Sequence, residues 1–70
     1  MLRLMLVGCG NRGRKWARVV KANLDCEIAA YVDIDPKALI RVKKECDGKD
    51  VLSFTDYTEA AENVDIDAAI

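Results

Sequence analysis

The sequence contains no histidine, and its three cysteines, Cys9, Cys26 and Cys46, form neither a C-x-x-C motif nor an even set. Ser-His and Cys-His catalytic pairs are therefore impossible, and the cysteines predict neither a zinc site nor a disulfide framework. A reducing, cytoplasmic setting fits this cysteine usage. The carboxylates stand at expected helix caps and strand ends. We therefore expect no catalytic residue and no metal site within these 70 residues.

The chain also lacks a strong net charge and a long apolar run. Its 11 basic and 12 acidic residues argue against a general nucleic-acid-binding protein, which would carry a basic excess. No stretch approaches the ~20 apolar residues of a membrane span. The segment 6–9 resembles a lipoprotein processing site, but too few residues precede Cys9 for the charged and apolar segments that secretion requires. We expect neither a nucleic-acid partner nor a membrane.

Glycine is scarce, but three of the four glycines lie in one G-x-G-x-x-G motif, from Gly8 to Gly13. An apolar run precedes the motif, and a helical pattern follows it. This spacing lets a strand turn tightly into a helix, brings backbone N–H groups up to a pyrophosphate and lets the helix pack closely on the sheet. Asp33 stands 20 residues beyond Gly13, at the end of a second apolar run, where a carboxylate can bind the adenosine ribose. The pattern predicts a dinucleotide site.

Strand-like and helix-like segments alternate along the whole chain. Strands are expected over 2–7, 25–33, 51–54 and 66–70, and helices over 12–23, 36–46 and about two turns after Asp56, which is the expected cap of the third helix. Asp35 and Pro36 suit the start of the second helix, and Gly48 suits its end. The order predicts an α/β fold, namely the first β-α-β-α-β-α-β half of a Rossmann-type, three-layer, doubly wound parallel sheet.

The first helix separates into two faces. Its apolar positions 13, 17, 20 and 24 share one face, which is expected to lie on the sheet, with Trp16 packing on its flank. Gly13 belongs to this face, where a side chain would push the helix away from the strand. Arg14, Arg18 and Lys21 take the other side. Residues 1–24 hold six basic side chains and no acid, which suits an anionic ligand, but a solvated face is the favoured interpretation for these three.

Four segments together resemble the start of a Gfo/Idh/MocA family oxidoreductase. They are the glycine turn 8–13, Tyr-Val-Asp-Ile-Asp-Pro at 31–36, Tyr-Thr-Glu at 57–59 and Asp-Ile-Asp-Ala-Ala-Ile at 65–70. The resemblance spans nearly all 70 residues and implies the N-terminal part of a dinucleotide-binding Rossmann domain. Members are NAD(P)-dependent dehydrogenases that act mostly on sugars, inositols and related polyols. They are commonly oligomers, so the resemblance implies a homo-oligomeric parent protein.

The resemblance also assigns cofactor-binding roles. It implies a pyrophosphate turn, backbone N–H groups that reach the phosphates, an acid on the ribose and an apolar residue against the adenine. The residues concerned are Gly8, Gly10 and Gly13 for the turn, Asn11 and Arg12 for the phosphates, Asp33 for the ribose and Ile34 for the adenine. Asp33 and Asp35 together should repel a 2′-phosphate, and no Arg or Lys follows in that turn, so NAD is favoured over NADP.

The family's catalytic lysine lies in a Glu-Lys-Pro segment after the fifth strand, and its substrate contacts come from a second domain. These 70 residues contain neither, so we expect the parent protein to be a dehydrogenase and this chain alone to be inactive. The final run 66–70 would also form a bare apolar edge strand, which is a template for aggregation. Residues 1–70 are therefore interpreted as the first part of a longer chain.

Two alternatives remain at this stage. A Rossmann half can serve as a non-catalytic nucleotide sensor or interaction module, because function resides in sites and not in folds. A methyltransferase that uses S-adenosylmethionine also places its cofactor over a glycine turn. Such enzymes usually carry an acid two residues before the first glycine, where this chain has Leu6.

Overall fold

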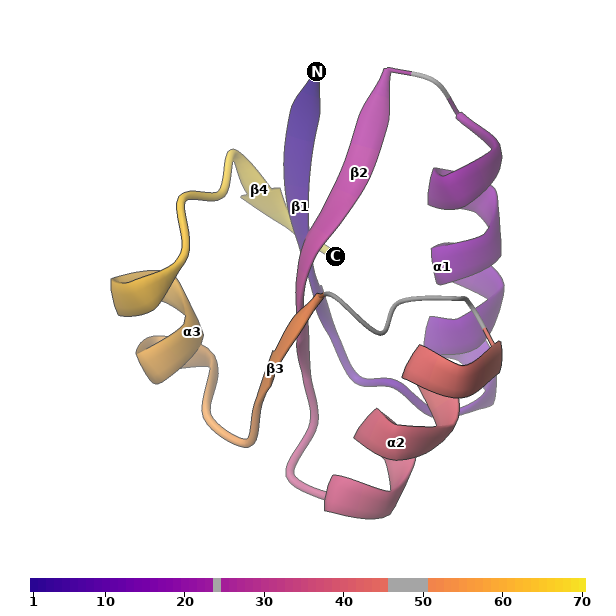
Figure 1. Ribbon diagram of the computed structural model, residues 1–70, viewed down its shortest axis with the longest axis vertical. Coiled ribbons are helices and arrows are strands. Elements are labelled where there is room, and N and C mark those ends of the chain that lie inside the picture. Colours follow the sequence, from indigo (N-terminus) through magenta and orange to yellow (C-terminus); the bar gives the residue numbers. More distant parts are fainter. Residues whose placement is uncertain (24, 46–50) are drawn as a thin grey trace.

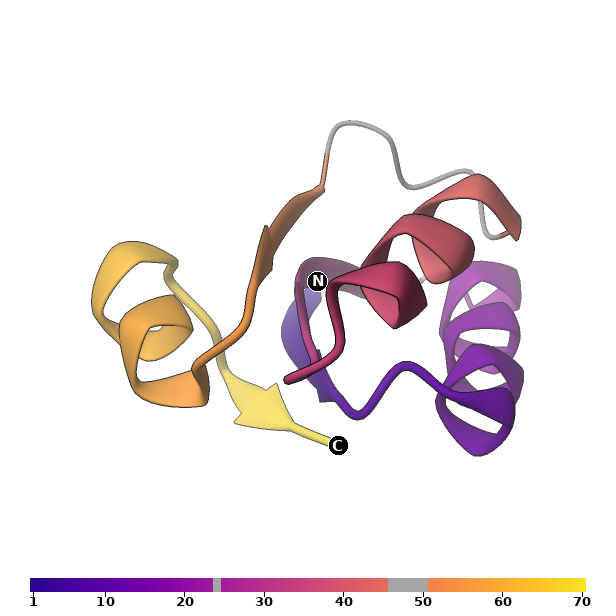
Figure 2. The same cartoon turned by 90° about the horizontal axis from the view of Figure 1, so that it is seen from below.

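The computed structural model describes residues 1–23, 25–45 and 51–70, and within these ranges strands and helices alternate (Figure 1). The elements are β1 (Leu2–Val7), α1 (Asn11–Ala22), β2 (Cys26–Val32), α2 (Pro36–Glu45), β3 (Leu52–Phe54), α3 (Tyr57–Asn63) and β4 (Ala68–Ala69). The strands pair in parallel in the order β3-β2-β1-β4. Helices α1 and α2 cover one face of the sheet and α3 the other (Figures 1 and 2). This arrangement confirms the predicted three-layer half of a doubly wound fold.

Strand β1 lies at the centre of the sheet, where the direction of strand addition reverses. On one side β1 pairs with β2, with Val7 opposite Val32, and on the other side with β4, with Met5 opposite Ala69. The crossover helices on the two sides lie on opposite faces of the sheet. In open α/β sheets, ligands bind in the crevice outside the carboxyl ends of the strands at such a reversal point. Here that point is the turn that follows Val7.

The core forms two clusters, one on each face of the sheet. Neighbouring residues of β1 serve both, because successive side chains of a strand point to opposite faces: Leu6 packs toward α1 and α2, and Met5 toward α3. The first cluster contains Leu6, Cys9, Ala17, Tyr31, Ala38, Leu39 and Val42, and the second contains Met5, Ala30, Val32 and Ala60. The expected buried face of the first helix is confirmed over the described residues, since Gly13, Ala17 and Val20 are buried. Leu24, Cys46 and Gly48, which the sequence placed at the ends of the first two helices, lie outside those residues.

Several boundaries and faces differ from the sequence prediction. Strand β4 begins two residues later than expected. At Asp67 the side-chain carboxylate, in place of a backbone carbonyl, accepts a hydrogen bond from the Arg3 N–H at 2.8 Å. The Asp67 N–H donates to the Arg3 carbonyl at 2.7 Å. Pairing then continues to Ile70, whose N–H donates to Met5. Trp16 was expected to pack on the flank of the first helix but is 48% exposed. Helix α1 begins at Asn11, one residue earlier than expected.

In the described part of the chain, no helix has the length and apolar character needed to cross a membrane. Among the same residues, no three His, Cys, Asp or Glu side chains are grouped so that they could hold a metal ion.

Candidate functional site

The three glycines of the turn have three different physical roles. Gly8 adopts a φ of 89°, a backbone conformation that side chains other than glycine rarely tolerate. A Cβ atom on Gly13 would lie 1.9 Å from the carbonyl oxygen of Gly8, so a side chain there would force α1 away from the turn. Gly10 has an ordinary φ of −76°, and a Cβ atom on it would meet no described atom within 4 Å. The fold therefore requires the first and third glycines, whereas Gly10 faces open space.

Asp33 fastens this turn to the end of β2. Its Oδ2 atom accepts a hydrogen bond from the Cys9 N–H at 2.8 Å, and its Oδ1 atom accepts from the Asp35 N–H at 2.9 Å. The neighbouring Gly8 N–H donates to the Val32 carbonyl at 2.7 Å. Each carboxylate oxygen can accept more than one hydrogen bond, so Asp33, which is only half-buried, retains acceptor capacity for ligand hydroxyls.

The start of α1 differs from the starts of the other two helices. The Asp35 carboxylate accepts from the Lys37 N–H at the start of α2, and the Asp56 carboxylate accepts from the Thr58 N–H at the start of α3. These contacts confirm both expected caps. The N-cap of α1 is Gly10, which has no side chain to offer, and the first turn of the helix contains no acidic residue. Unsatisfied N–H groups and the helix dipole make such an end favourable for an anion.

Two clefts flank the glycine turn at the carboxyl edge of the sheet, and Val7 and Gly8 line both. One cleft has a volume of about 400 Å³ and lies where β1 meets β4; its lining also includes Gly10, Asn11, Arg12, Gly13 and Ile70. The other has a volume of about 480 Å³ and lies beyond β2 and β3; its lining includes Asp33, Ile34, Asp56 and Tyr57. Both volumes fall within the range of small-molecule sites.

The structure brings all seven sequence-predicted site residues to this one edge. The five residues of the turn and helix start line the first cleft, and Asp33 and Ile34 line the second. The Ile34 side chain is 89% exposed, so its surface is available to a flat apolar group. Cys9 lies inside the turn but is fully buried, and it packs in the core cluster between the sheet and the first two helices.

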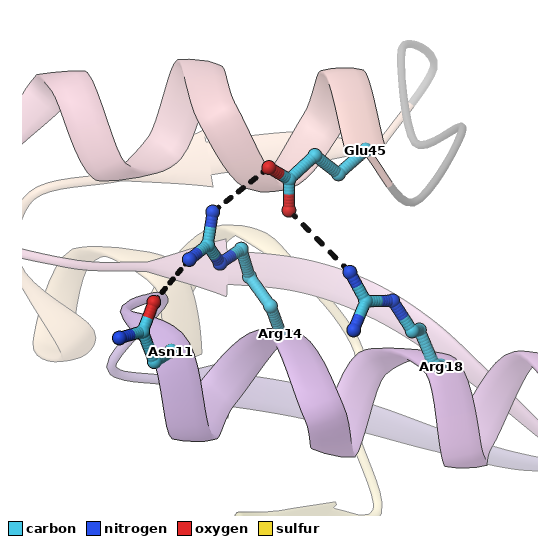
Figure 3. A network of polar contacts seen from close by, with 4 residues as sticks. All are labelled: Asn11, Arg14, Arg18 and Glu45. Atoms are coloured by element: carbon cyan, nitrogen blue, oxygen red, sulfur yellow. Dashed lines mark hydrogen bonds and ion pairs between the residues drawn. The ribbon is translucent and has the colours of Figure 1, made fainter.

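The sequence analysis missed a polar network behind the turn (Figure 3). Arg14 donates from Nη1 to Glu45 at 2.8 Å and from Nη2 to the Asn11 side-chain oxygen. Its side chain is only 15% exposed, so the expected solvated position is wrong for Arg14. Arg18 fits that expectation better, because its side chain is 62% exposed and its guanidinium lies 3.7 Å from Glu45. The network joins α1 to the last turn of α2, a contact between helices that spacing within one helix cannot reveal.

No family model and no curated protein sequence matches the chain. Several solved structures are similar to the chain. Scyllo-inositol dehydrogenase from Lactobacillus casei, determined with bound NAD(H) and scyllo-inositol, has a TM-score of 0.85 and 24% identity over 100% of this chain. Myo-inositol 2-dehydrogenase from Lactobacillus plantarum has a TM-score of 0.80 and 27% identity over 97% of this chain. The chain spans about a fifth of the length of these proteins, since it covers 20% of each.

The strand order, the glycine turn and these similarities define the class of the chain. It has the fold of the first half of a Rossmann domain. Within that class it resembles the N-terminal domain of Gfo/Idh/MocA family oxidoreductases, to which the inositol dehydrogenases belong, as the four sequence segments predict.

Proposed function

We propose that this chain is the NAD-binding portion of an NAD(P)-dependent oxidoreductase that acts on a CH–OH group of a sugar, inositol or related polyol. The observation that carries this proposal is the open position of Gly10. The protein needs no glycine there for its own packing or backbone conformation, yet Gly10 stands at the uncapped start of α1 beside a cleft. A glycine that only a ligand would require is a mark of close backbone approach to a pyrophosphate.

In this proposal the dinucleotide would occupy both clefts. The pyrophosphate lies against the start of α1, where the backbone N–H groups of Asn11 and Arg12 donate to its oxygens. The adenosine half occupies the larger cleft, where Asp33 accepts from the ribose hydroxyls and Ile34 lies against the adenine. The nicotinamide half extends into the cleft between β1 and β4. When bound, NAD supplies the hydride chemistry, and the task of the chain is to hold and orient it.

The charge around the ribose site supports NAD as the cofactor. Asp33 and Asp56 both line the larger cleft, and among the described residues that line it there is neither Arg nor Lys. A 2′-phosphate would therefore meet carboxylates without a cation to bind it. The similar scyllo-inositol dehydrogenase structure contains NAD(H), which is consistent with this preference.

In this proposal residues 1–70 form the N-terminal part of the cofactor domain and contribute no catalytic residue. Substrate binding and proton transfer then require a further domain, and the working enzyme is a cytoplasmic homo-oligomer. The substrate class follows the similar structures, which are inositol dehydrogenases. The methyltransferase alternative gains no support from the site, because Leu6, where such enzymes usually carry an acid, is buried in the core.

Titration of the full natural polypeptide with NADH, followed by cofactor fluorescence, tests this function. We expect saturable binding with a Kd between about 1 μM and 1 mM, the range common for enzyme ligands. Two parallel titrations, with NADPH and with S-adenosylmethionine, provide the comparison, and both should bind more weakly. Failure to bind NADH, or preferential binding of S-adenosylmethionine, would refute the proposal.

A further inference from the structure

The contact between Arg14 and Asn11 fixes which way the Asn11 side-chain amide faces. An arginine guanidinium carries only hydrogen-bond donors, so the atom of Asn11 that meets it must be the acceptor oxygen Oδ1. The structure has this arrangement, with Arg14 Nη2 donating to Oδ1. The amide nitrogen Nδ2, a donor of two hydrogen bonds, consequently points away from Arg14 (Figure 3).

Glu45 holds the guanidinium that performs this orientation. Its Oε1 atom accepts from Arg14 Nη1 at 2.8 Å, and the Arg14 side chain is 15% exposed. Because the guanidinium is planar, contacts on two of its nitrogens fix both its position and its tilt. Arg18 also approaches Glu45, but at 3.7 Å and with a side chain that is 62% exposed, so it constrains the carboxylate less.

Asn11 is the first residue of α1 and lines the cleft with Gly10 and Arg12. A side-chain NH₂ group there adds a donor beside the backbone N–H groups at the helix start. We propose that Asn11 Nδ2 donates to the pyrophosphate of the dinucleotide and that Arg14, held by Glu45, is the residue that positions it. This inference rests on the proposed function, because it needs a dinucleotide in the site.

The charge of Arg14 alone does not explain the arrangement. Its guanidinium is paired with the Glu45 carboxylate, so much of its field at the phosphates is cancelled. The influence of Arg14 on the ligand therefore passes through Asn11. If both residues act through one contact, the effects of their substitutions on NADH binding should be strongly non-additive. General electrostatic attraction by Arg14 would instead give additive effects.

The test is a double-mutant cycle in the full natural polypeptide, with the Kd for NADH as the measurement. Asn11→Ala and Arg14→Met should each weaken NADH binding about tenfold, a change typical of a lost hydrogen bond to a charged group. The double variant should bind no more than about twofold more weakly than Asn11→Ala alone. Arg18→Met removes the same charge from the next turn of the helix and should change the Kd less than about twofold.

Additive effects in the double variant, or unchanged NADH binding by Asn11→Ala, would overturn this inference. If Arg14→Met impairs folding, Arg14→Lys provides the second route: it keeps the charge beside Glu45 but loses the planar group that contacts both Glu45 and Asn11, and its effect on the Kd should also vanish in the Asn11→Ala background. Asp33→Ala distinguishes the two proposals. If NADH binds and Asp33→Ala weakens it while Asn11→Ala does not, only the role of Asn11 and Arg14 fails; if NADH does not bind the wild type, both proposals fail.

Discussion

The Asp33 carboxylate accepts a 2.8 Å hydrogen bond from the backbone N–H of Cys9, 24 residues earlier in the chain. This bond joins the end of β2 to the glycine turn that follows β1. The same carboxylate accepts from the Asp35 N–H through its other oxygen. Asp33 therefore shapes the turn in addition to its proposed contact with the ribose, and its two roles should be separable by measurement.

Replacement of Asp33 by alanine should affect both ligand binding and stability. We expect NADH binding to weaken by about 1–3 kcal/mol, because hydrogen bonds to a charged group are lost. The free energy of unfolding should fall by about 1–2 kcal/mol, since the Cys9 and Asp35 N–H groups lose their acceptor. Fluorescence titration and urea unfolding provide the two values. An unchanged NADH affinity would exclude Asp33 from the ribose site.

Replacement of Gly13 tests the close packing of α1 on the turn. The methyl group of Gly13→Ala would lie 1.9 Å from the Gly8 carbonyl oxygen, so the helix or the turn must move. We expect a loss of about 1–3 kcal/mol or more in the free energy of unfolding, as found when cores are overpacked. Gly13→Leu should be worse. A melting temperature equal to that of the wild type would contradict the packing role.

Gly10→Ala is the matched counterpart of Gly13→Ala, because its main effect should be on NADH binding and its effect on stability should be smaller. The φ of Gly10 suits alanine, and the added methyl group would meet no described atom of the protein. Because alanine is a poorer N-cap than glycine, the free energy of unfolding should fall by no more than about 1 kcal/mol. NADH affinity should fall, because the methyl group occupies the space that the pyrophosphate needs. If Gly10→Ala bound NADH as well as the wild type does, the open position of Gly10 would no longer support the proposed function.

The residues that could be read from the sequence are those whose role depends on local spacing. The glycine positions, the caps at Asp35 and Asp56 and the buried face of α1 all follow from neighbours within a few residues. Spacing also predicted the doubly wound parallel fold, because alternating strands and helices leave few right-handed topologies.

The contacts that sequence reasoning missed depend on how distant elements meet. The pairing of Arg14 with Glu45 requires the last turn of α2 to lie beside the first turn of α1. The bond from Cys9 to Asp33 requires β1 and β2 to be neighbours in the right register. Asp67 was expected inside a strand, but its carboxylate takes an N–H of β1 and delays β4.

The preference for NAD over NADP rests on the charge of the larger cleft. Asp33 and Asp56 line this cleft. Ile34, which follows Asp33, also lines it and is 89% exposed and uncharged. A cation at position 34 would reach the space beside the ribose, where a 2′-phosphate would lie. Replacement of Asp33 by serine would reduce the repulsion of a 2′-phosphate and place a hydroxyl group in the site.

The double variant Asp33→Ser/Ile34→Arg should therefore shift the cofactor preference toward NADPH. We expect the ratio of the NADPH and NADH dissociation constants to fall at least about tenfold, because an arginine binds a phosphate through two charge-assisted hydrogen bonds. Isothermal titration with both cofactors measures the ratio, and its salt dependence should increase for NADPH. Ile40→Arg is the control, since it adds the same charge at a side chain that is 69% exposed on α2. An equal gain in Ile40→Arg would mean that net charge, and not position 34, governs NADPH binding.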